Sequence, residues 1–260
     1  MRELLKHPIT AENVTAGQLD VIIAEEWSNM VSMCPTLDPD AKINAYFDSD
    51  LVGSSTLAWA AHTIVLKDNV WQPSLTTLEY AGYDFTIGVN PAPFNGWHVS
   101  SVCSGISWRY DLRTVLRHEM IHGMGFGTSI NGAGLTGHYS RSTCYPRIYD
   151  SVIEDEDGNR ILDGCTLQRD ISMINLYING VQLFNPYFFM PGSSISHHTT
   201  YNALMFWQLH YGECLGIGTP EIKILSAVGT QCSGNPLYSA APMAYPALYA
   251  VSLVLILFLF

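Results

Sequence analysis

The spacing of apolar residues predicts several helices and strands in the first half of the chain. From Gly17 to Ser32, large apolar side chains recur at helical spacing and predict an amphipathic helix. Residues 41–47 and 84–90 alternate between apolar and polar side chains, which predicts two strands, and residues 56–66 predict another helix. The mixture predicts an α+β fold in which a twisted sheet lies beside two long helices.

A further helix is predicted to begin after Asp111, a residue type that favours the N-cap position. Residues 112–121 are apolar on most sides, so we expect this helix to be buried, with Arg113 and Arg117 on one solvated stripe. The helix should end within one turn of His122, because the chain can turn sharply at the glycines that follow. These are Gly123, Gly125 and Gly127.

The same helix contains the sequence His118-Glu119-Met120-Ile121-His122. One turn of helix brings its two histidines onto the same face, where they can share one metal ion beside a carboxylate. A single buried histidine is more often satisfied by hydrogen bonds within a core. Two at this spacing, with Glu119 between them, favour a metal site.

The run from His118 to Gly123-Met124-Gly125-Phe126 resembles the active-site helix and turn of the metzincin metallopeptidases. Compact members of that family have a third histidine at the position that Thr128 occupies here, and a hydroxyl is a poor zinc ligand. The leishmanolysin-like branch instead inserts a long segment before its last histidine. The resemblance to this branch therefore implies a third ligand much later in the chain.

Ser196-His197, followed by Asn202-Ala203-Leu204-Met205, resembles the late Ser-His pair and the Met-turn of that branch. The resemblance implies that His197 is the third ligand, with the adjacent His198 as the alternative. It also implies that Met205 packs beneath the metal without binding it. Residues 221–229 resemble the terminal helix of the same enzymes. Other downstream candidates are His138 and His210, with Asp150 and Glu154 as the carboxylates of another zinc-peptidase architecture.

Three imidazoles leave one position of a zinc ion open for water, and Glu119 is placed to accept the proton of that water. The resemblance thus implies a zinc endopeptidase that acts on protein or peptide substrates. The alternative is a non-catalytic surface module with a vestigial or structural zinc site. Tyr201, Tyr211 and His210 are open candidates for stabilising the oxyanion.

The composition indicates which partners the protein can bind and whether it contains disulfides. The net charge is −11 and only 13% of residues are charged, which argues against a nucleic-acid partner. The acidic run at residues 154–159 lacks the ligand spacing of a calcium loop, so we interpret it as a solvated hairpin turn. Six cysteines, none in a C-x-x-C pair, predict three disulfides. His62 and His98 are interpreted as structural.

The chain is predicted to form one catalytic domain over residues 1–232. Its N-terminal subdomain extends to about residue 127, and an insertion and a C-terminal subdomain occupy residues 128–232. Residues 233–260 form a spacer and an apolar tail with the composition of a GPI-attachment signal, and a membrane-anchoring segment is the alternative. An anchored enzyme would lie at the cell surface. Met1–Pro8 has no apolar signal sequence, which predicts that the start of the gene is incomplete.

Overall fold

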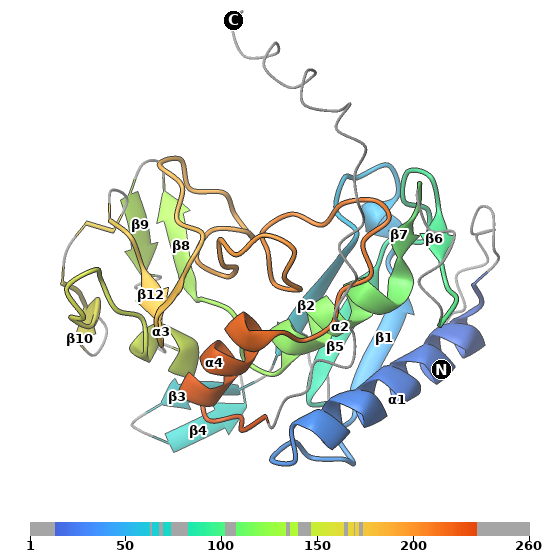
Figure 1. Cartoon of the computed structure of the whole chain (residues 1–260), viewed down its shortest axis with the longest axis horizontal. Helices are drawn as coiled ribbons and strands as arrows, with labels where there is room; N and C mark the ends of the chain where they lie inside the picture. The colour runs from blue at the N-terminus through green and yellow to red at the C-terminus, as the bar shows by residue number, and fades with distance from the viewer. Residues whose placement is uncertain are drawn as a thin grey trace, which may run out of the picture.

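The computed structural model describes residues 14–62, 64–67, 70–73, 83–101, 108–133, 136–139, 147–163, 166–168, 170–171 and 174–232. Helices and small sheets are mixed along this part of the chain (Figure 1), which confirms the predicted α+β class. The apolar tail at residues 247–260 and the start at Met1–Pro8 lie outside the described residues. Among the residues that are described, no helix has both the length and the apolar character needed to cross a bilayer.

A three-stranded sheet forms the centre of the N-terminal half. The strand β5 (Phe85–Val89) lies between β1 (Ile43–Phe47), which is parallel to it, and β2 (Ala58–His62), which is antiparallel and forms one edge. The two predicted strands are therefore confirmed. The helix predicted over residues 56–66 is wrong, because this segment forms β2 and the start of β3 (Ile64–Lys67).

Pairing with β5 explains why residues 58–62 are extended. Alanine, which favours helices, occupies three of the five β2 positions, but every β2 residue has a partner on β5. Trp59 lies opposite Gly88, and a Cβ atom at Gly88 would be only 2.4 Å from the indole nitrogen. The indole N–H also donates to Asp48, at 2.7 Å. Tertiary contacts thus override the local helix preference.

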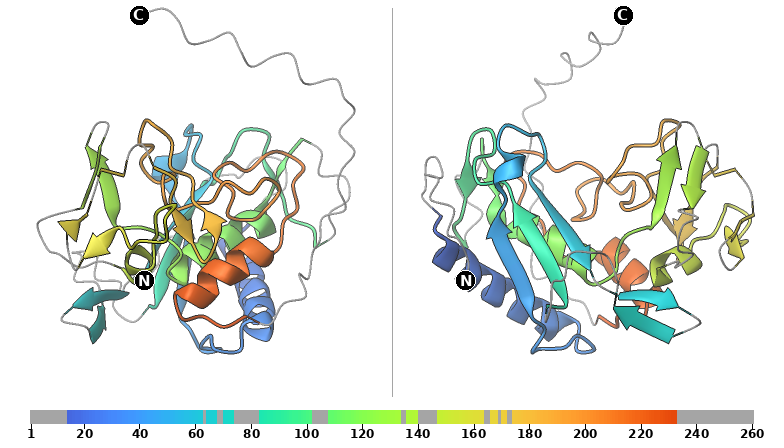
Figure 2. Two further views of the ribbon diagram at one scale, coloured as in Figure 1. Left: turned by 60° about the vertical axis from the view of Figure 1, so that its left-hand side comes forward. Right: turned by 180° about the vertical axis from the view of Figure 1, so that it is seen from behind.

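Two helices cover one face of this sheet (Figures 1 and 2). The helix α1 (Ala16–Met33) confirms the amphipathic helix predicted over Gly17 to Ser32, and it begins with a capping box between Thr15 and Gln18. Trp27 of α1 packs edge-on against Phe85 of β5, with 5.6 Å between ring centroids. The helix α2 (Leu112–Gly123) contacts α1, β2 and β5, so it lies at the centre of the core.

The predicted solvated stripe of α2 is wrong. Arg117 is only 5% exposed, and it donates to both carboxylate oxygens of Glu26 on α1, at 2.6 and 3.2 Å. It also donates to the carbonyl of Leu215, at 2.9 Å. Arg113 donates to Glu26 and to the exposed Glu25, each at 2.7 Å. This face of α2 therefore binds α1 through buried ion pairs, because the guanidinium groups find carboxylate partners there.

The C-terminal half is built from short elements around the helix α4 (Thr219–Ala227), which confirms the predicted terminal helix. In Figure 1 the described elements between residues 130 and 178 lie on the left, beyond α2, and α4 crosses in front. The remaining elements are η1 (Ser49–Leu51), α3 (Ile148–Ser151), and the strand pairs β3 with β4 (Val70–Pro73), β6 (Trp97–His98) with β7 (Tyr110–Asp111), β8 (Ile130–Ala133) with β9 (Thr136–Tyr139), β10 (Leu162–Asp163) with β11 (Thr166–Leu167), and β12 (Tyr177–Ile178) with β13 (Val181–Gln182).

The acidic run forms the expected turn, since Glu154 and Arg160 pair across it and Gly158 has a φ of +80°. Asp155 differs from the expectation because it is buried, and its carboxylate accepts the backbone N–H of Asn159 at 2.9 Å. One acidic side chain of the turn therefore accepts a hydrogen bond from the backbone of the same turn.

One of the expected disulfides joins Cys34, after α1, to Cys232, after α4. Cys214 is also disulfide-bonded. The remaining cysteines, Cys103, Cys144 and Cys165, lie outside the described residues.

Candidate metal centre

The local sequence of α2 fixes the positions of His118 and His122. Asp111 caps the helix as predicted, because its carboxylate accepts the backbone N–H of Thr114 at 2.8 Å. The helix ends at Gly123, also as predicted. A Cβ atom at Gly123 would lie 2.4 Å from the ring of Phe85, so the close approach of helix and sheet requires glycine at this position.

His197 lies on the long loop that leads to α4, and this loop brings it to the α2 pair. The metal-binding atoms of His118, His122 and His197 all lie within 4.8 Å of one another. The three ring centroids are 4.8 to 5.0 Å apart. The backbone of the loop is held by the segment that follows β13, since the N–H of Phe184 donates to the carbonyl of His197 at 2.8 Å.

Each of the three imidazoles is oriented by a backbone carbonyl. Nδ1 lies 2.7 Å from Leu204 O in His118, 2.6 Å from Phe126 O in His122 and 3.0 Å from Ser193 O in His197. A carbonyl only accepts, so Nδ1 carries the proton in each neutral ring and Nε2 keeps a free lone pair. The three rings therefore present the tautomer that binds a metal through Nε2.

Burial keeps all three histidines neutral. It lowers the pKa of His118 and of His122, and it lowers the pKa of His197 to about 3, with the neighbouring imidazoles adding to the effect. Nε2 of His118 lies 3.0 Å from Nε2 of His197. Two unprotonated nitrogens repel each other at this distance unless a cation lies between them. Imidazole nitrogens on a tetrahedral zinc ion are about 3.3 Å apart, so this donor set fits zinc.

Glu119 directly follows His118 on α2. Its side chain is buried, and burial raises the pKa of Glu119 to about 8. Within the described part of the chain, no side chain or backbone N–H donates to its carboxylate. With this pKa, Glu119 can hold or release a proton near neutral pH.

His198 has a different environment from its neighbour His197. It is fully buried, and its Nε2 lies 2.9 Å from Oε1 of Glu221 on α4. Its Nδ1 accepts the backbone N–H of Thr200. The backbone N–H of His198 donates to the carbonyl of Met205. Both ring nitrogens thus already have partners. His198 is not in the three-histidine group.

Glu221 links α4 to the segment around Met205. One carboxylate oxygen accepts the N–H of Met205 at 3.0 Å as well as His198, and the other accepts the N–H of Gly218 at 2.8 Å. Burial opposes ionisation, but these hydrogen bonds outweigh it and lower the pKa of Glu221. Met205 is fully buried, and the carbonyl of Leu204 beside it orients His118.

Thr128, at the position where the sequence comparison with compact metzincins expects a third histidine, is engaged in hydrogen bonds. Its hydroxyl donates to the buried carboxylate of Asp150 at 2.5 Å, and its N–H donates to the hydroxyl of Ser196 at 3.2 Å. The N–H of Ser129 also donates to Asp150. Asp150 therefore organises the turn after α2 and is not part of the three-histidine group.

The other candidates from the sequence have separate environments. Glu154 pairs with Arg160, and His98 lies 3.4 Å from Asp111. Tyr211 packs against Tyr110, at the N-terminal end of α2. Among the described residues, none of these joins the three histidines. The side chains of His62 and His138 lie outside the described part of the chain.

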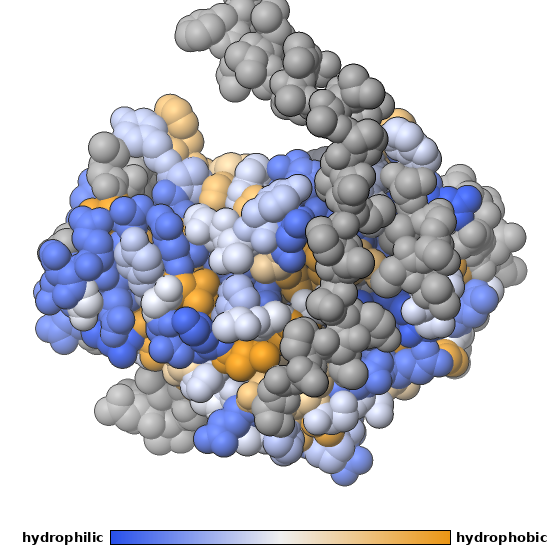
Figure 3. Space-filling model, in the orientation of Figure 1, coloured by the Kyte–Doolittle hydropathy of each residue, from blue (hydrophilic) through white to orange (hydrophobic). Residues whose placement is uncertain are grey.

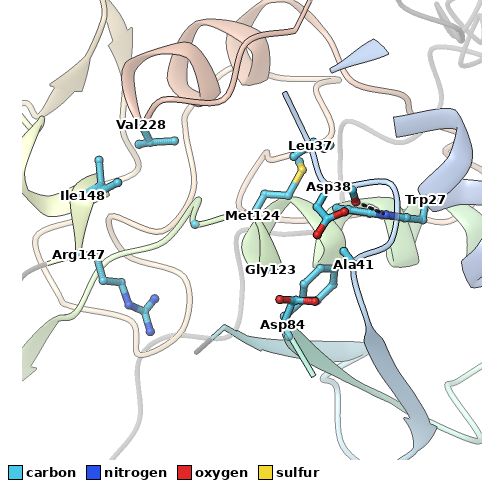
Figure 4. A pocket seen from close by; sticks show the side chains of 12 residues that line it. Trp27, Leu37, Asp38, Ala41, Asp84, Gly123, Met124, Arg147, Ile148 and Val228 are labelled. Atoms are coloured by element: carbon cyan, nitrogen blue, oxygen red, sulfur yellow. Dashed lines mark hydrogen bonds between the residues drawn. The ribbon is translucent and has the colours of Figure 1, made fainter. Parts of the chain in front are cut away.

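A cavity of about 330 Å³ lies near the turn that follows α2 (Figure 4). Met124 points into its centre, with Arg147 on one side and the carboxylates of Asp38 and Asp84 on the other. Its walls are mainly apolar. None of the three clustered histidines lines it, so this cavity is distinct from the candidate metal centre.

The sequence reasoning did not assign a role to Glu221 or to Glu26, and Asp150 was considered only as a ligand. Each is a buried carboxylate that needs a partner. Glu221 stands in an otherwise mainly apolar helix, which is a usable signal for such a partner.

Comparisons of the chain with protein-family models, with characterised proteins and with solved structures found no match to any of them.

Proposed function

We propose that this protein is a zinc-dependent endopeptidase of the metzincin type, similar to the leishmanolysin-like branch. The observation that carries the proposal is the convergence of three neutral imidazoles, from His118, His122 and His197, each with its Nδ1 held by a carbonyl. Three histidine ligands of this kind are typical of a catalytic zinc site.

The residues around this cluster have separate roles in the proposed reaction. Zinc, when bound, supplies a Lewis acid that lowers the pKa of water and polarises the scissile carbonyl. Glu119 accepts a proton from the attacking water and then donates it to the leaving amine. Its buried position excludes bulk water from this exchange. No covalent bond between the protein and the substrate is required.

The order of elements supports the metzincin assignment. The helix α2 ends in a glycine turn, a late Ser196-His197 pair follows, and Met205 and α4 come next in the chain. The edge strand β2 also packs against α2. An edge strand offers backbone groups with which an extended peptide can pair, and this suits a peptidase.

The test combines zinc analysis with cleavage of casein by the purified full-length protein. We expect about one zinc ion per chain and activity that a chelator removes. Glu119→Gln should retain zinc and lose activity by about 10²- to 10⁴-fold, the usual contribution of a general base. Glu156→Gln, at an exposed carboxylate, is the matched control and should retain full activity.

The outcomes separate the two functions considered for this site. Cleavage at the parent rate by Glu119→Gln would show that Glu119 is not the base. Stoichiometric zinc without any peptidase activity would identify a non-catalytic module with a structural metal. A parent protein without metal would refute both.

We also propose that the protein acts at the cell surface, held by a lipid anchor at its C-terminal end. The support is the composition of residues 233–260, in which Ser233-Gly234-Asn235 is followed by a Pro-rich spacer and an apolar run. Release of the enzyme from cells by a phosphatidylinositol-specific phospholipase tests this, and a mature protein that retains Phe260 would refute it.

A further inference from the structure

The cavity of about 330 Å³ beside Met124 lies between the two halves of the chain. One wall comes from α1, from the loop that follows it and from the start of β5. The other wall comes from the start of α3 and the end of α4, and the turn after α2 lies between the two walls (Figure 4). Segments that are distant in sequence therefore meet around this cavity.

Most of the cavity wall is apolar. Trp27 and Phe85 form part of one side and pack edge-on, and Ile148 and Val228 belong to the other side. The surface around α4 is mixed, with apolar residues among hydrophilic ones (Figure 3). A Cβ atom built on Gly125, which also lines the cavity, would have no other atom within 4 Å. Ligand sites in proteins are mainly apolar and usually enclose about 300 to 1,000 Å³, so this cavity has the size for a small ligand.

Charged side chains of opposite sign lie on the two sides of this apolar interior. In Figure 4 Arg147 lies across the cavity from the carboxylates of Asp38 and Asp84. Backbone N–H groups hold both carboxylates in place, since Asp38 accepts from Asp40 at 2.9 Å and Asp84 accepts from Lys42 at 2.7 Å. Side chains that are already held in position lose less freedom when a ligand binds, which favours binding.

We propose that this cavity binds a small apolar zwitterion, either an amino acid or a dipeptide with free ends. Its ammonium group pairs with Asp38 and Asp84, and its carboxylate pairs with Arg147, because a planar guanidinium matches a carboxylate in geometry. Its apolar side chains pack against the walls. A fatty acid brings no cation to the two carboxylates, and an organic amine brings no anion to Arg147, so each fits the charges less well.

This inference goes beyond the proposed peptidase function and does not depend on it. None of the three clustered histidines lines the cavity, and neither does Glu119. The ligand is therefore bound apart from the proposed catalytic residues, and its binding can be measured without any reaction.

Isothermal titration calorimetry of the full-length protein with the dipeptide Phe-Leu and with free phenylalanine tests the proposal. We expect at least one of them to bind with a Kd of roughly 0.05 to 2 mM, the range for so small a ligand. The tighter of the two identifies the length that the cavity takes. Acetylation of its amine or amidation of its carboxylate removes one charge. Each change should weaken binding about two- to fivefold, the effect of a partly exposed ion pair.

Substitution in the protein tests the ammonium contact from the other side. Asp38→Asn and Asp84→Asn together remove both negative charges but keep an oxygen that can accept the backbone N–H. The double variant should bind the zwitterion about fivefold more weakly. It should bind the N-acetyl form, which has no ammonium group, as the parent does. Asp50→Asn, at an exposed carboxylate outside the cavity, is the matched control and should change neither affinity.

The outcomes keep this proposal separate from the peptidase. Binding should persist after a chelator has removed the metal, and loss of binding with the metal would place the ligand at the histidines and refute the cavity site. If neither zwitterion binds, or if the form blocked at both ends binds as tightly, the cavity proposal fails whether or not casein is cleaved. Binding that needs both charged ends and both aspartates, in a protein that cleaves no casein, would leave the cavity site standing without the peptidase.

Discussion

Nε2 of His198 lies 2.9 Å from a carboxylate oxygen of Glu221, and both side chains are fully buried. The neighbouring His197 instead directs its Nε2 toward His118, at 3.0 Å. Two adjacent histidines therefore have different tasks. One joins α4 to the loop, and the other contributes to the cluster.

This division predicts different effects of substitution at the two histidines. His197→Ala removes a proposed ligand, so zinc affinity should fall by more than about 100-fold, beyond the range seen when only a supporting residue is lost. His198→Asn changes only a supporting residue, so zinc affinity should fall by about 10- to 100-fold or less. Competition with a chromophoric chelator measures both, and circular dichroism checks folding. Full zinc occupancy in the His197→Ala protein would reassign the site.

Glu221→Gln should destabilise the protein by about 2 kcal/mol. The carboxylate accepts hydrogen bonds from three donors, and an amide group cannot accept from all of them. Thermal or urea unfolding at neutral pH measures the loss. Glu156→Gln, at an exposed carboxylate, should change stability by less than about 0.5 kcal/mol. An equally small change for Glu221→Gln would show that the pair is not stabilising.

The same substitution should change the dependence of stability on pH. The pKa of Glu221 is lowered in the folded protein, so its ionised form stabilises the fold. That contribution is complete above the unfolded pKa of a glutamate, about 4.3, and is lost as the pH falls through the lower folded value. Unfolding temperatures measured from pH 7 to pH 3 should therefore fall less steeply for Glu221→Gln than for the parent protein. Parallel curves would contradict the assignment.

Arg117→Met should cost about 3 kcal/mol of stability, because it leaves Glu26 buried with only Arg113 as a partner. Glu25→Gln is the natural comparison. It breaks an ion pair in which Glu25 is exposed, and such pairs contribute about 1 kcal/mol or less. Urea unfolding distinguishes the two. Similar small losses for both variants would mean that the buried pair does not hold α1 to α2.

Thr128→Val tests whether this residue serves the fold and not the metal. The variant loses the hydroxyl that donates to Asp150, so stability should fall by about 1 to 2 kcal/mol. Zinc stoichiometry should not change, because the hydroxyl of Thr128 is already bonded to Asp150 and a hydroxyl is a poor zinc ligand. A loss of zinc without a loss of stability would show that Thr128 acts as a ligand.

Much of the site could be predicted from local sequence. The Asp111 cap, the helical spacing of His118 and His122 and the glycine end of α2 all depend on residues within one or two turns of each other. The placement of His197 beside them depended on the resemblance to a known family. Local sequence could not predict it, because the loop returns to α2 through contacts with Phe184 and Leu204.

The wrong predictions of a helix over residues 56–66 and of a solvated stripe on α2 have a common physical cause. Residues 58–62 favour a helix by composition but pair with β5, and Arg117 has the composition of a solvated position but meets Glu26. In both cases a partner distant in sequence decides the outcome. Buried carboxylates such as Glu221 and Asp150 show the same limit, since their donors come from other segments. Periodicity describes one segment at a time and does not identify such partners.

The Cys34–Cys232 disulfide connects positions separated by 198 residues, and the three clustered histidines lie between them. A single cut in that interval opens the chain without releasing a fragment, because the two pieces stay covalently linked. Self-digestion of a peptidase built in this way would leave an apparently intact band on a non-reducing gel and two bands after reduction. The electrophoretic mass without reductant is therefore a poor guide to whether a preparation has been nicked.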